Sequence, residues 1–381
     1  MTNSVYITRS SAALPNAPVE NDLVEAVLGQ VGERPSRARR IVQRNNGIKR
    51  RHYVIDPKTG EPTHTNASLT AEAIRGLFGN GFALEDIACL ACGTSNPDQL
   101  MPNHAVMVHG ELGGHGFEAV ATAGVCLSGT TAFKYGWMSV LSGCSKNAVV
   151  TGSEIASMGL RAQNYRGEEK AADLEARPEL AFEKDFLRWM LSDGAGALLL
   201  EPTPRKGLNL RIEWMDLFSY AHALPACMYM GAEKNGDTKL HGWMLFTPEE
   251  RNSLSVFALK QDVRLLNEAV VEYTLVKPLE RVIAKHKLAP RDIQWFLPHM
   301  SSEYFRKPVA DGIARAGLPI APERWFTNLT TVGNTGSAAI YLMLDELLKS
   351  GRLRHGERLL CFVPESGRFS SGFLSLVAHH A

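Results

Sequence analysis

Short apolar runs alternate with amphipathic segments along most of the chain. Five runs are apolar enough and short enough to predict buried strands: 86–93, 117–122, 148–152, 292–297 and 357–364. Segments with helical periodicity lie between them, and the clearest are 68–77, 254–286, 302–316 and the second part of 326–351, which begins as a glycine-rich loop. Strands that are apolar on both faces are typical of a sheet covered by helices on each side. The pattern therefore predicts an α/β protein.

The same order of elements occurs twice along the sequence. Each half reads strand, helix, strand, helix, strand, and a break rich in proline and basic residues falls at 202–206. We therefore expect two halves of similar architecture, an N-terminal half at 1–204 and a C-terminal half at 205–381. The segment 192–196 is predicted to be a glycine-rich turn that leads into a strand.

Composition and charge argue against several classes of function. The chain has 381 residues, 45% of them hydrophobic and 21% charged, with a net charge of +1, so neither nucleic acid nor a membrane surface is an expected partner. The sequence has no secretory signal and no apolar run of the roughly 18 residues that a membrane helix needs. Cys89 and Cys92 fall on opposite faces of a predicted strand, which suits neither a disulfide nor a metal site. We expect free thiols, a cytoplasmic protein, and no metal or cofactor.

A single cysteine stands where a predicted strand gives way to a predicted helix. The run 117–122 is followed by Gly124, Cys126 and a helix that continues to Val140. At such a turn, free backbone N–H groups and the positive end of the helix dipole favour a thiolate, which is the nucleophilic form of cysteine. The alternative is that Cys126 is a small buried apolar residue, as many cysteines are.

Two further polar residues suit the same chemistry. His299 follows the strand of 292–297, and Asn334 lies in a glycine-rich loop before a helix. With Cys126 they form a set sufficient for acyl transfer with carbon–carbon bond formation: the cysteine would carry an acyl group, and a neutral imidazole and an amide would donate hydrogen bonds to an enolate. Separately, each residue also fits an ordinary loop or helix-capping role.

With these residues in view, the chain resembles the thiolase superfamily, and within it the condensing enzymes similar to β-ketoacyl-acyl-carrier-protein synthase III. The matching segments run through nearly the whole chain: 46–52, 91–102, 119–132, 149–154, 192–201, 295–302 and 333–339. The resemblance implies a layered αβαβα fold of two pseudo-duplicated halves. It also implies a homodimer, acyl-CoA or acyl-carrier-protein thioesters as substrates, and Cys126, His299 and Asn334 as the catalytic residues.

Three departures indicate a divergent branch, similar to condensing enzymes of dialkylresorcinol and aryl-polyene pathways. The segment 41–51 lacks the tryptophan that stacks on coenzyme A in typical members, and HMSS replaces the usual HQAN at 299–302. The loop 364–372 places Glu365 and Arg368 where small residues are usual. We expect one of these two to contact the second substrate or the Cys126 loop, and a surface ion pair is the alternative.

Basic residues supply candidates for binding a carrier. The segment 34–51 is rich in arginine and ends with Arg50 and Arg51, and Arg306 and Lys307 follow His299. They could receive a phosphopantetheine phosphate or the acidic face of a carrier protein, or form only a solvated basic face. The acyl chain needs an apolar tunnel, for which 227–230 and 243–246 are candidates.

Three functions remain open on the sequence. The first is a Claisen-type condensation of two acyl thioesters, in secondary lipid or polyketide biosynthesis or in the initiation of fatty-acid synthesis. The second is acyl transfer to an oxygen or nitrogen nucleophile. The third is a non-catalytic subunit of a heteromeric synthase, which usually has lost its cysteine, whereas Cys126 is present here.

Overall fold

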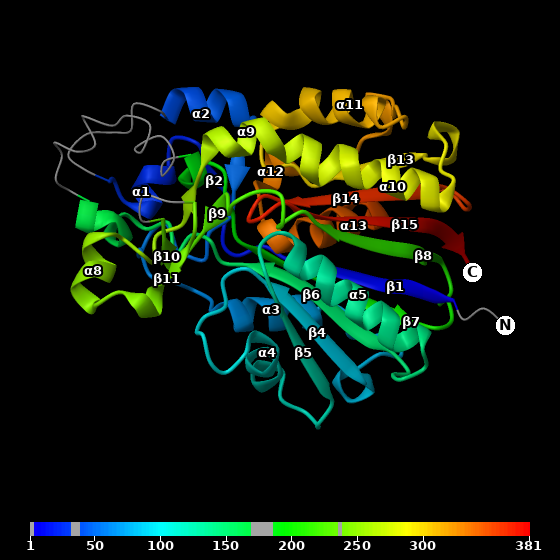
Figure 1. Cartoon of the computed structure of the whole chain (residues 1–381). Helices are drawn as coiled ribbons and strands as arrows, with labels where there is room; N and C mark the ends of the chain where they lie inside the picture. Colours follow the sequence, from blue (N-terminus) through cyan, green and yellow to red (C-terminus); the bar gives the residue numbers. More distant parts are fainter. Residues whose placement is uncertain (1–3, 32–38, 169–185, 235–237) are drawn as a thin grey trace.

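One large mixed sheet organises the computed structural model of the protein, which describes residues 4–31, 39–168, 186–234 and 238–381. Nine strands lie in the order β13-β14-β15-β8-β1-β7-β6-β4-β5 (Figure 1). In sequence order their bounds are β1 Val5–Ala13, β4 Cys89–Thr94, β5 Glu118–Ala123, β6 Ala148–Glu154, β7 Gly194–Glu201, β8 Leu208–Ser219, β13 Trp295–Pro298, β14 Arg358–Glu365 and β15 Ser370–His380.

The strands repeat one pattern in the two halves of the chain. β7 pairs antiparallel with β1 and β6, and β15 pairs antiparallel with β8 and β14. Beyond these strands the pairing turns parallel, between β6 and β4 and between β14 and β13. β1 and β8 join the two sets over Val5–Ile7. The chain passes from one set to the other between β7 and β8, at the predicted boundary of 204/205, but one sheet spans both sets, so the division into domains stays a prediction.

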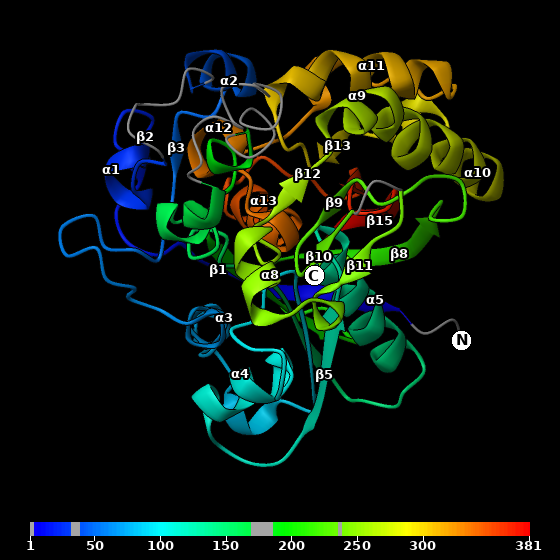
Figure 2. The ribbon, with the colours of Figure 1, turned by 60° about the vertical axis from the view of Figure 1, so that its left-hand side comes forward.

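Three large apolar cores divide the described residues into five layers, and a fourth, small cluster lies around Ala338. The central core surrounds α5 (Leu127–Leu141) and α13 (Ala339–Lys349), which lie between the two sets of strands. A second core packs α3 (Asn66–Arg75) and α4 (His104–Leu112) on the outer face of β4, β6 and β7. A third packs α9 (Val263–Val271), α10 (Lys277–His286) and α11 (Arg306–Arg315) on the outer face of β14 and β15. The αβαβα layering is therefore confirmed (Figures 1 and 2).

Smaller elements cover one end of these layers, where Figure 2 shows them gathered. Their bounds are β2 Val19–Glu20, α1 Val24–Leu28, α2 Arg39–Asn46, β3 Arg50–Arg51, β9 Met228–Tyr229, β10 Ala232–Glu233, β11 His241–Gly242, α8 Pro248–Ser253, β12 Lys260–Gln261 and α12 Leu329–Val332. No helix in the described residues is both long and apolar enough to cross a membrane.

Two predicted elements differ from the structure. The helix predicted over 254–286 starts only at Val263, because β12 pairs with β9 just before it, and a π-helical turn at Glu272–Val276 interrupts it. The predicted glycine-rich turn at 192–196 is instead the start of β7. Its glycines are needed inside the sheet, since a Cβ on Gly196 would lie 2.4 Å from the Cβ of Tyr341 in α13.

The two halves meet most closely where α5 and β6 approach the start of α13. A Cβ on Gly129 would lie 2.4 Å from the carbonyl oxygen of Ser337, and one on Gly152 would lie 2.2 Å from the same atom. The Tyr341 hydroxyl crosses the contact and donates to the Gly129 carbonyl at 2.7 Å. Glycine at these positions therefore sets the spacing of the central layer.

Adding one methyl group at this contact should destabilise the protein. Gly152→Ala forces backbone apart in a closed core, so we expect a loss of about 2–3 kcal/mol of stability and a lower thermal midpoint. Gly110→Ala in α4 is the matched control, because nothing lies within 4 Å of its added Cβ, and it should be neutral or stabilising by up to about 1 kcal/mol. Equal midpoints for the two variants would contradict the packing account.

Candidate active site

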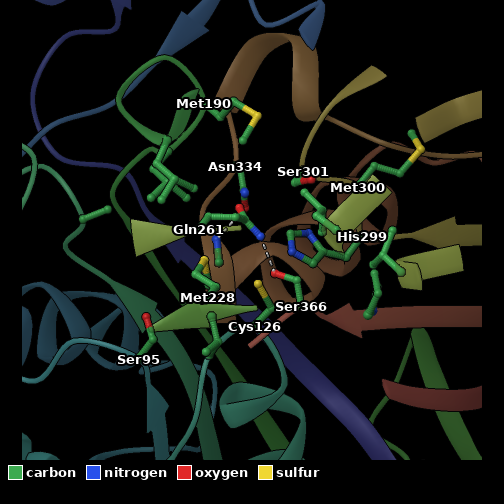
Figure 3. A pocket seen from close by; sticks show the side chains of 18 of the residues that line it. Ser95, Cys126, Met190, Met228, Gln261, His299, Met300, Ser301, Asn334 and Ser366 are labelled. Atoms are coloured by element: carbon green, nitrogen blue, oxygen red, sulfur yellow. Dashed lines mark hydrogen bonds between the residues drawn. The ribbon is translucent and has the colours of Figure 1, made fainter. Parts of the chain in front are cut away.

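A cavity of about 350 Å³ opens between the two halves of the molecule. Cys126, His299 and Asn334 all line it, although they come from three distant parts of the sequence. Figure 3 shows the three side chains around this common space. The structure thus brings together the three residues singled out from the sequence.

Cys126 occupies the turn between β5 and α5. It is the N-cap residue of α5, and Gly124 before it has φ +152°, a conformation that L side chains rarely adopt. The Val125 carbonyl accepts hydrogen bonds from the Ser128 N–H at 3.1 Å and the Ser128 hydroxyl at 2.7 Å. These bonds close the turn and hold the cysteine at the cavity wall, where its side chain is half-buried.

The electrostatic environment keeps the Cys126 sulfur protonated. Burial raises the pKa of the thiol, and the carboxylates of Glu365 and Glu154 raise it further. The prediction of a thiolate stabilised by the helix terminus is therefore wrong for the resting site. Loss of solvation beside two acidic groups outweighs the favourable dipole of α5.

His299 enters the cavity directly after β13. Its backbone N–H donates to the Phe362 carbonyl of the neighbouring β14 at 2.8 Å, and its side chain is almost completely buried. Burial lowers the pKa of the imidazole to about 4. The prediction of an uncharged His299 at neutral pH is confirmed, and a neutral ring can donate one hydrogen bond without carrying a charge.

Asn334 is held in place by hydrogen bonds of its backbone and of its side-chain oxygen. Its N–H donates to the Met190 carbonyl at 3.0 Å, and its carbonyl accepts from the Ser192 N–H at 2.8 Å. The side-chain Oδ1 accepts from the Gly336 N–H at 3.0 Å. With the oxygen engaged, the amide nitrogen is the part of the side chain left to donate into the cavity.

Apolar side chains form most of the cavity wall. They come from the segment 187–191, from β9, from α9 and the π-helical turn, and from α11. Met228 and Met230 of the tunnel candidate 227–230 are among them, whereas no residue of the other candidate, 243–246, lines the cavity. The π-helical turn contributes Thr274 and Leu275, and such turns often occur at functional sites.

Two buried acids at or near the cavity were not predicted from the sequence as site residues. Glu154 ends β6 and lines the cavity, and burial raises the pKa of its carboxyl to about 7. Asp193 precedes β7 and accepts from the backbone N–H groups of Val54 at 2.8 Å and Ser157 at 2.9 Å, while burial raises its pKa to about 6. Each of these acids lies at the end or directly before the start of an apolar strand, and this position in the sequence could have marked both as candidates.

The basic candidates do not lie on the cavity wall. Arg50 is exposed and paired with Glu20 at 2.9 Å. Arg51 is fully buried and donates to the Trp189 carbonyl at 3.0 Å and to Asn21 at 2.8 Å. Because its side chain is buried, Arg51 has a structural role and cannot contact a carrier at the surface.

The remaining basic candidates lie on the outside of the molecule. Arg306 pairs with Glu303 and Lys307 with Asp311 along α11. Arg34 and Arg37 of the basic segment lie outside the described residues. Arg306 and Lys307 therefore keep a place on the surface as candidates for carrier contact.

The two unusual residues of the C-terminal loop have different surroundings. Glu365 reaches the Cys126 turn: its Oε2 accepts from the Val125 N–H at 2.8 Å and the Leu127 N–H at 3.0 Å. Arg368 is exposed and donates to the carbonyls of Ala221 at 3.0 Å and Leu224 at 3.4 Å. The predicted contact with the Cys126 loop is thus made by Glu365, and the alternative of a surface ion pair is wrong for it.

Sequence comparison relates the chain to one group of enzymes. Residues 283–370 match the family described as 3-oxoacyl-[acyl-carrier-protein (ACP)] synthase III C terminal. The β-ketoacyl-[acyl-carrier-protein] synthase III 2 of Deinococcus radiodurans is 26% identical over 334 residues, which cover 85% of this chain and 83% of that protein. The synthase III of Clostridium perfringens is 25% identical and covers 91% of each chain.

Solved structures share the fold over the whole chain. The tetronic acid condensing enzyme AbyA1 superposes with a TM-score of 0.75 at 23% identity and covers 98% of this chain and 99% of its own. Xanthomonas campestris OleA, in a variant with bound lauric acid and lauroyl-CoA, gives a TM-score of 0.74 at 16% identity and covers 99% and 100%.

The layered fold and the sequence relatives together define a thiolase-like condensing enzyme, which is an acyltransferase. Within that class, the chain is similar to the ketosynthase III enzymes, whose C-terminal family model matches residues 283–370.

The neutral state of His299 can be tested by titration. Nuclear magnetic resonance should show an imidazole with a midpoint near 4 that disappears in His299→Asn, while buried His104, whose pKa burial also lowers to about 4, remains as an internal reference. Because an unfolded histidine titrates near 6.5, the unfolded chain binds more protons between about pH 4 and 6.5. Stability should therefore fall as pH falls through that window, by about 3 kcal/mol for this residue. A midpoint above 6 would contradict the account.

Proposed function

We propose that the protein joins two acyl thioesters by a Claisen-type condensation through an acyl-enzyme on Cys126. The convergence of a thiol, a neutral imidazole and an amide on one largely apolar cavity is the observation that supports this function most strongly. These are the groups that thioester exchange and enolate stabilisation require.

In the first step, the Cys126 sulfur attacks the carbonyl carbon of an acyl thioester. The new C–S bond forms as the bond to the carrier thiol breaks, and the proton of Cys126 ends on the departing thiol. The apolar residues of 187–191 and of α9 hold the acyl chain and exclude water, which would hydrolyse the intermediate.

In the second step, the other thioester becomes a carbon nucleophile. Loss of CO₂ or of an α-proton leaves negative charge on its thioester oxygen, to which the His299 ring N–H and the Asn334 amide donate hydrogen bonds. The enolate carbon then attacks the acyl group on Cys126, a C–C bond forms, and the C–S bond breaks; the released sulfur becomes a thiol again by taking up one proton, which balances the α-proton lost in one route and comes from water in the decarboxylative route. Donors that are neutral and buried serve here because they need no reorganisation as charge develops.

The lining of the cavity favours alkyl chains over charged or strongly polar acyl groups. Methionines 190, 228, 230 and 300 line it, and flexible thioethers adapt to chains of different shape. We propose that both substrates are thioesters of coenzyme A or of an acyl carrier protein. We further propose that the reaction belongs to lipid or polyketide biosynthesis. Arg306 and Lys307, on the surface helix next to His299, are the candidates for carrier contact.

A homodimer is the assembly we propose. β5 ends the sheet in the described part of the chain, so its outer edge carries unpaired backbone groups, which favour pairing with another strand. Beside it, Tyr135 and Met138 expose apolar surface on α5, and the Tyr135 hydroxyl donates to Glu118 of β5. A second copy placed across this edge would cover both features.

Substitutions in the three cavity residues should separate the two steps. Cys126→Ala should give no acyl adduct by intact-mass measurement with a panel of acyl thioesters. His299→Ala and Asn334→Ala should still form the adduct but lose condensation by about 10²–10³-fold each, because each removes one enolate donor.

The matched control is Cys144→Ala, since Cys144 is exposed and should leave adduct and product unchanged. Product analysis then distinguishes the alternatives: an ester or amide in place of a carbon–carbon product would overturn the condensation.

The dimer can be tested by light scattering. The wild type should have a mass near twice 41.8 kDa, and a Tyr135→Asp/Met138→Asp variant should shift toward the monomer, because two charges would be buried in the contact. Met244→Asp is the control, since Met244 is 75% exposed on a different element. A monomeric wild type would contradict the proposal.

A further inference from the structure

A carboxylate is built into the turn that carries Cys126. Glu365 is the last residue of β14, and a single oxygen, Oε2, accepts hydrogen bonds from the residues on both sides of the cysteine. The same oxygen would lie 3.4 Å from a Cβ on Gly124. Glu365 therefore sits against the backbone of Cys126, although the two residues are far apart in sequence.

No cation in the described part of the chain forms an ion pair of 4 Å or less with this carboxylate. Its charge rests on the two N–H groups. Burial raises the pKa of Glu365 while these two hydrogen bonds lower it. Such a carboxyl group can gain or lose a proton without breaking a salt bridge.

The acyl transfer proposed above needs a proton acceptor near Cys126. The resting sulfur is a thiol, because its own burial and the charge of Glu365 raise its pKa. His299 is a poor acceptor, since burial lowers its pKa to about 4, and in the proposed second step it must donate. A thiol beside a carboxylate can pass its proton across and move the negative charge to sulfur, with no change of total charge in the cavity.

We propose that Glu365 accepts the proton of the Cys126 thiol when an acyl thioester is bound and returns it to the departing carrier thiol. The S–H bond of Cys126 breaks as its proton joins the carboxylate, and the sulfur forms a bond to the acyl carbon. The C–S bond to the carrier then breaks, and the carrier sulfur takes the proton from Glu365. The step needs no other reactant, and it rests on the function proposed above.

Glu154 is the other acid that the Cys126 thiol senses. It accepts from the backbone N–H and the hydroxyl of Ser337, both at 3.4 Å, just before α13, and it also has a side-chain hydrogen bond with Ser95. Glu365 alone of the two is bonded to the neighbours of the cysteine. Glu154 lines the cavity itself, and the hydrogen bonds to Val125 and Leu127 are the observation that favours Glu365 as the acceptor.

The test compares two reactions of Cys126 in Glu365→Gln. The amide oxygen of glutamine can still accept both N–H groups, so the turn is kept while the charge and the proton acceptor are removed. Alkylation by iodoacetamide needs only the thiolate, and its pH midpoint should move to lower pH. Acylation by an acyl thioester at pH 7 should nevertheless fall about a hundredfold, the usual scale of lost acid–base catalysis.

Comparison variants keep the outcome decisive. Glu323→Gln, at an exposed position, should match the wild type in both reactions, and Glu154→Gln should lose less acylation than Glu365→Gln. Unchanged or faster acylation in Glu365→Gln would overturn the proposal, as would a greater loss in Glu154→Gln. Loss of both reactions with a lower thermal midpoint would also overturn it and leave a structural role only.

Two safeguards separate this proposal from the proposed function. If Glu365→Gln does not fold, Glu365→Asp keeps the charge but shortens the side chain by one methylene, and it should slow acylation while the alkylation midpoint stays closer to that of the wild type. If the wild type itself forms no acyl adduct, the proposed function fails. In that case the alkylation midpoints still report whether Glu365 controls the proton of Cys126.

Discussion

The close contact between the two halves, made without side chains, is the constraint on which the rest of the structure depends. The Ser337 carbonyl occupies the space that a Cβ on Gly129 or Gly152 would need. Because these glycines belong to α5 and β6 and Ser337 precedes α13, this one contact fixes the beginnings of the two central helices relative to each other. Cys126 and Asn334 stand just before those helices, so packing of the central layer also sets the geometry of the cavity.

Enclosure by the two halves shifts the pKa values of four groups at or beside the cavity toward the neutral form of each group. The pKa of Cys126 rises, that of His299 falls to about 4, and those of Glu154 and Glu365 rise. Burial is the largest cause in each case. These shifts disfavour charge in the enclosed site, and a proton that passes between two of these groups moves charge without bringing an ion out of water.

Most of the fold could be predicted from the sequence because hydrophobic patterns and short motifs are local features of a chain. Apolar runs and helical periodicity identified the strands and helices, and the ordered motifs identified the layered family. The errors arose where long-range contacts decide. Residues 254–262 have helical periodicity, yet Gln261 pairs with Met228 in a short ladder that only the folded chain brings together. Gly194 and Gly196 look like a turn until the packing of Tyr341 against Gly196 is known.

At the site, too, local features could be predicted from the sequence and features that depend on long-range contacts could not. The residue types of Cys126, His299 and Asn334, and their positions before or after predicted elements, were visible in the sequence. The protonation state of the cysteine was not, because it depends on how deeply the turn is buried and on acids from other strands. Arg51 illustrates the same limit: its charge suggested a surface role, whereas its guanidinium is enclosed and bonded to the Trp189 carbonyl.

A thiol that is protonated at rest has a consequence for selectivity. A permanent thiolate in an open site would react with any electrophile that reached it, whereas a buried thiol is activated only when its proton can move. In the proposed reaction, an acyl chain that filled the apolar cavity would displace water and lower the local dielectric, which would strengthen the hydrogen bonds and charge interactions of the enclosed groups. On the proposed function, binding of the chain and activation of the sulfur would be coupled through the same burial. This coupling gives a physical reason for placing acids beside the nucleophile, where their first effect is to make it less reactive.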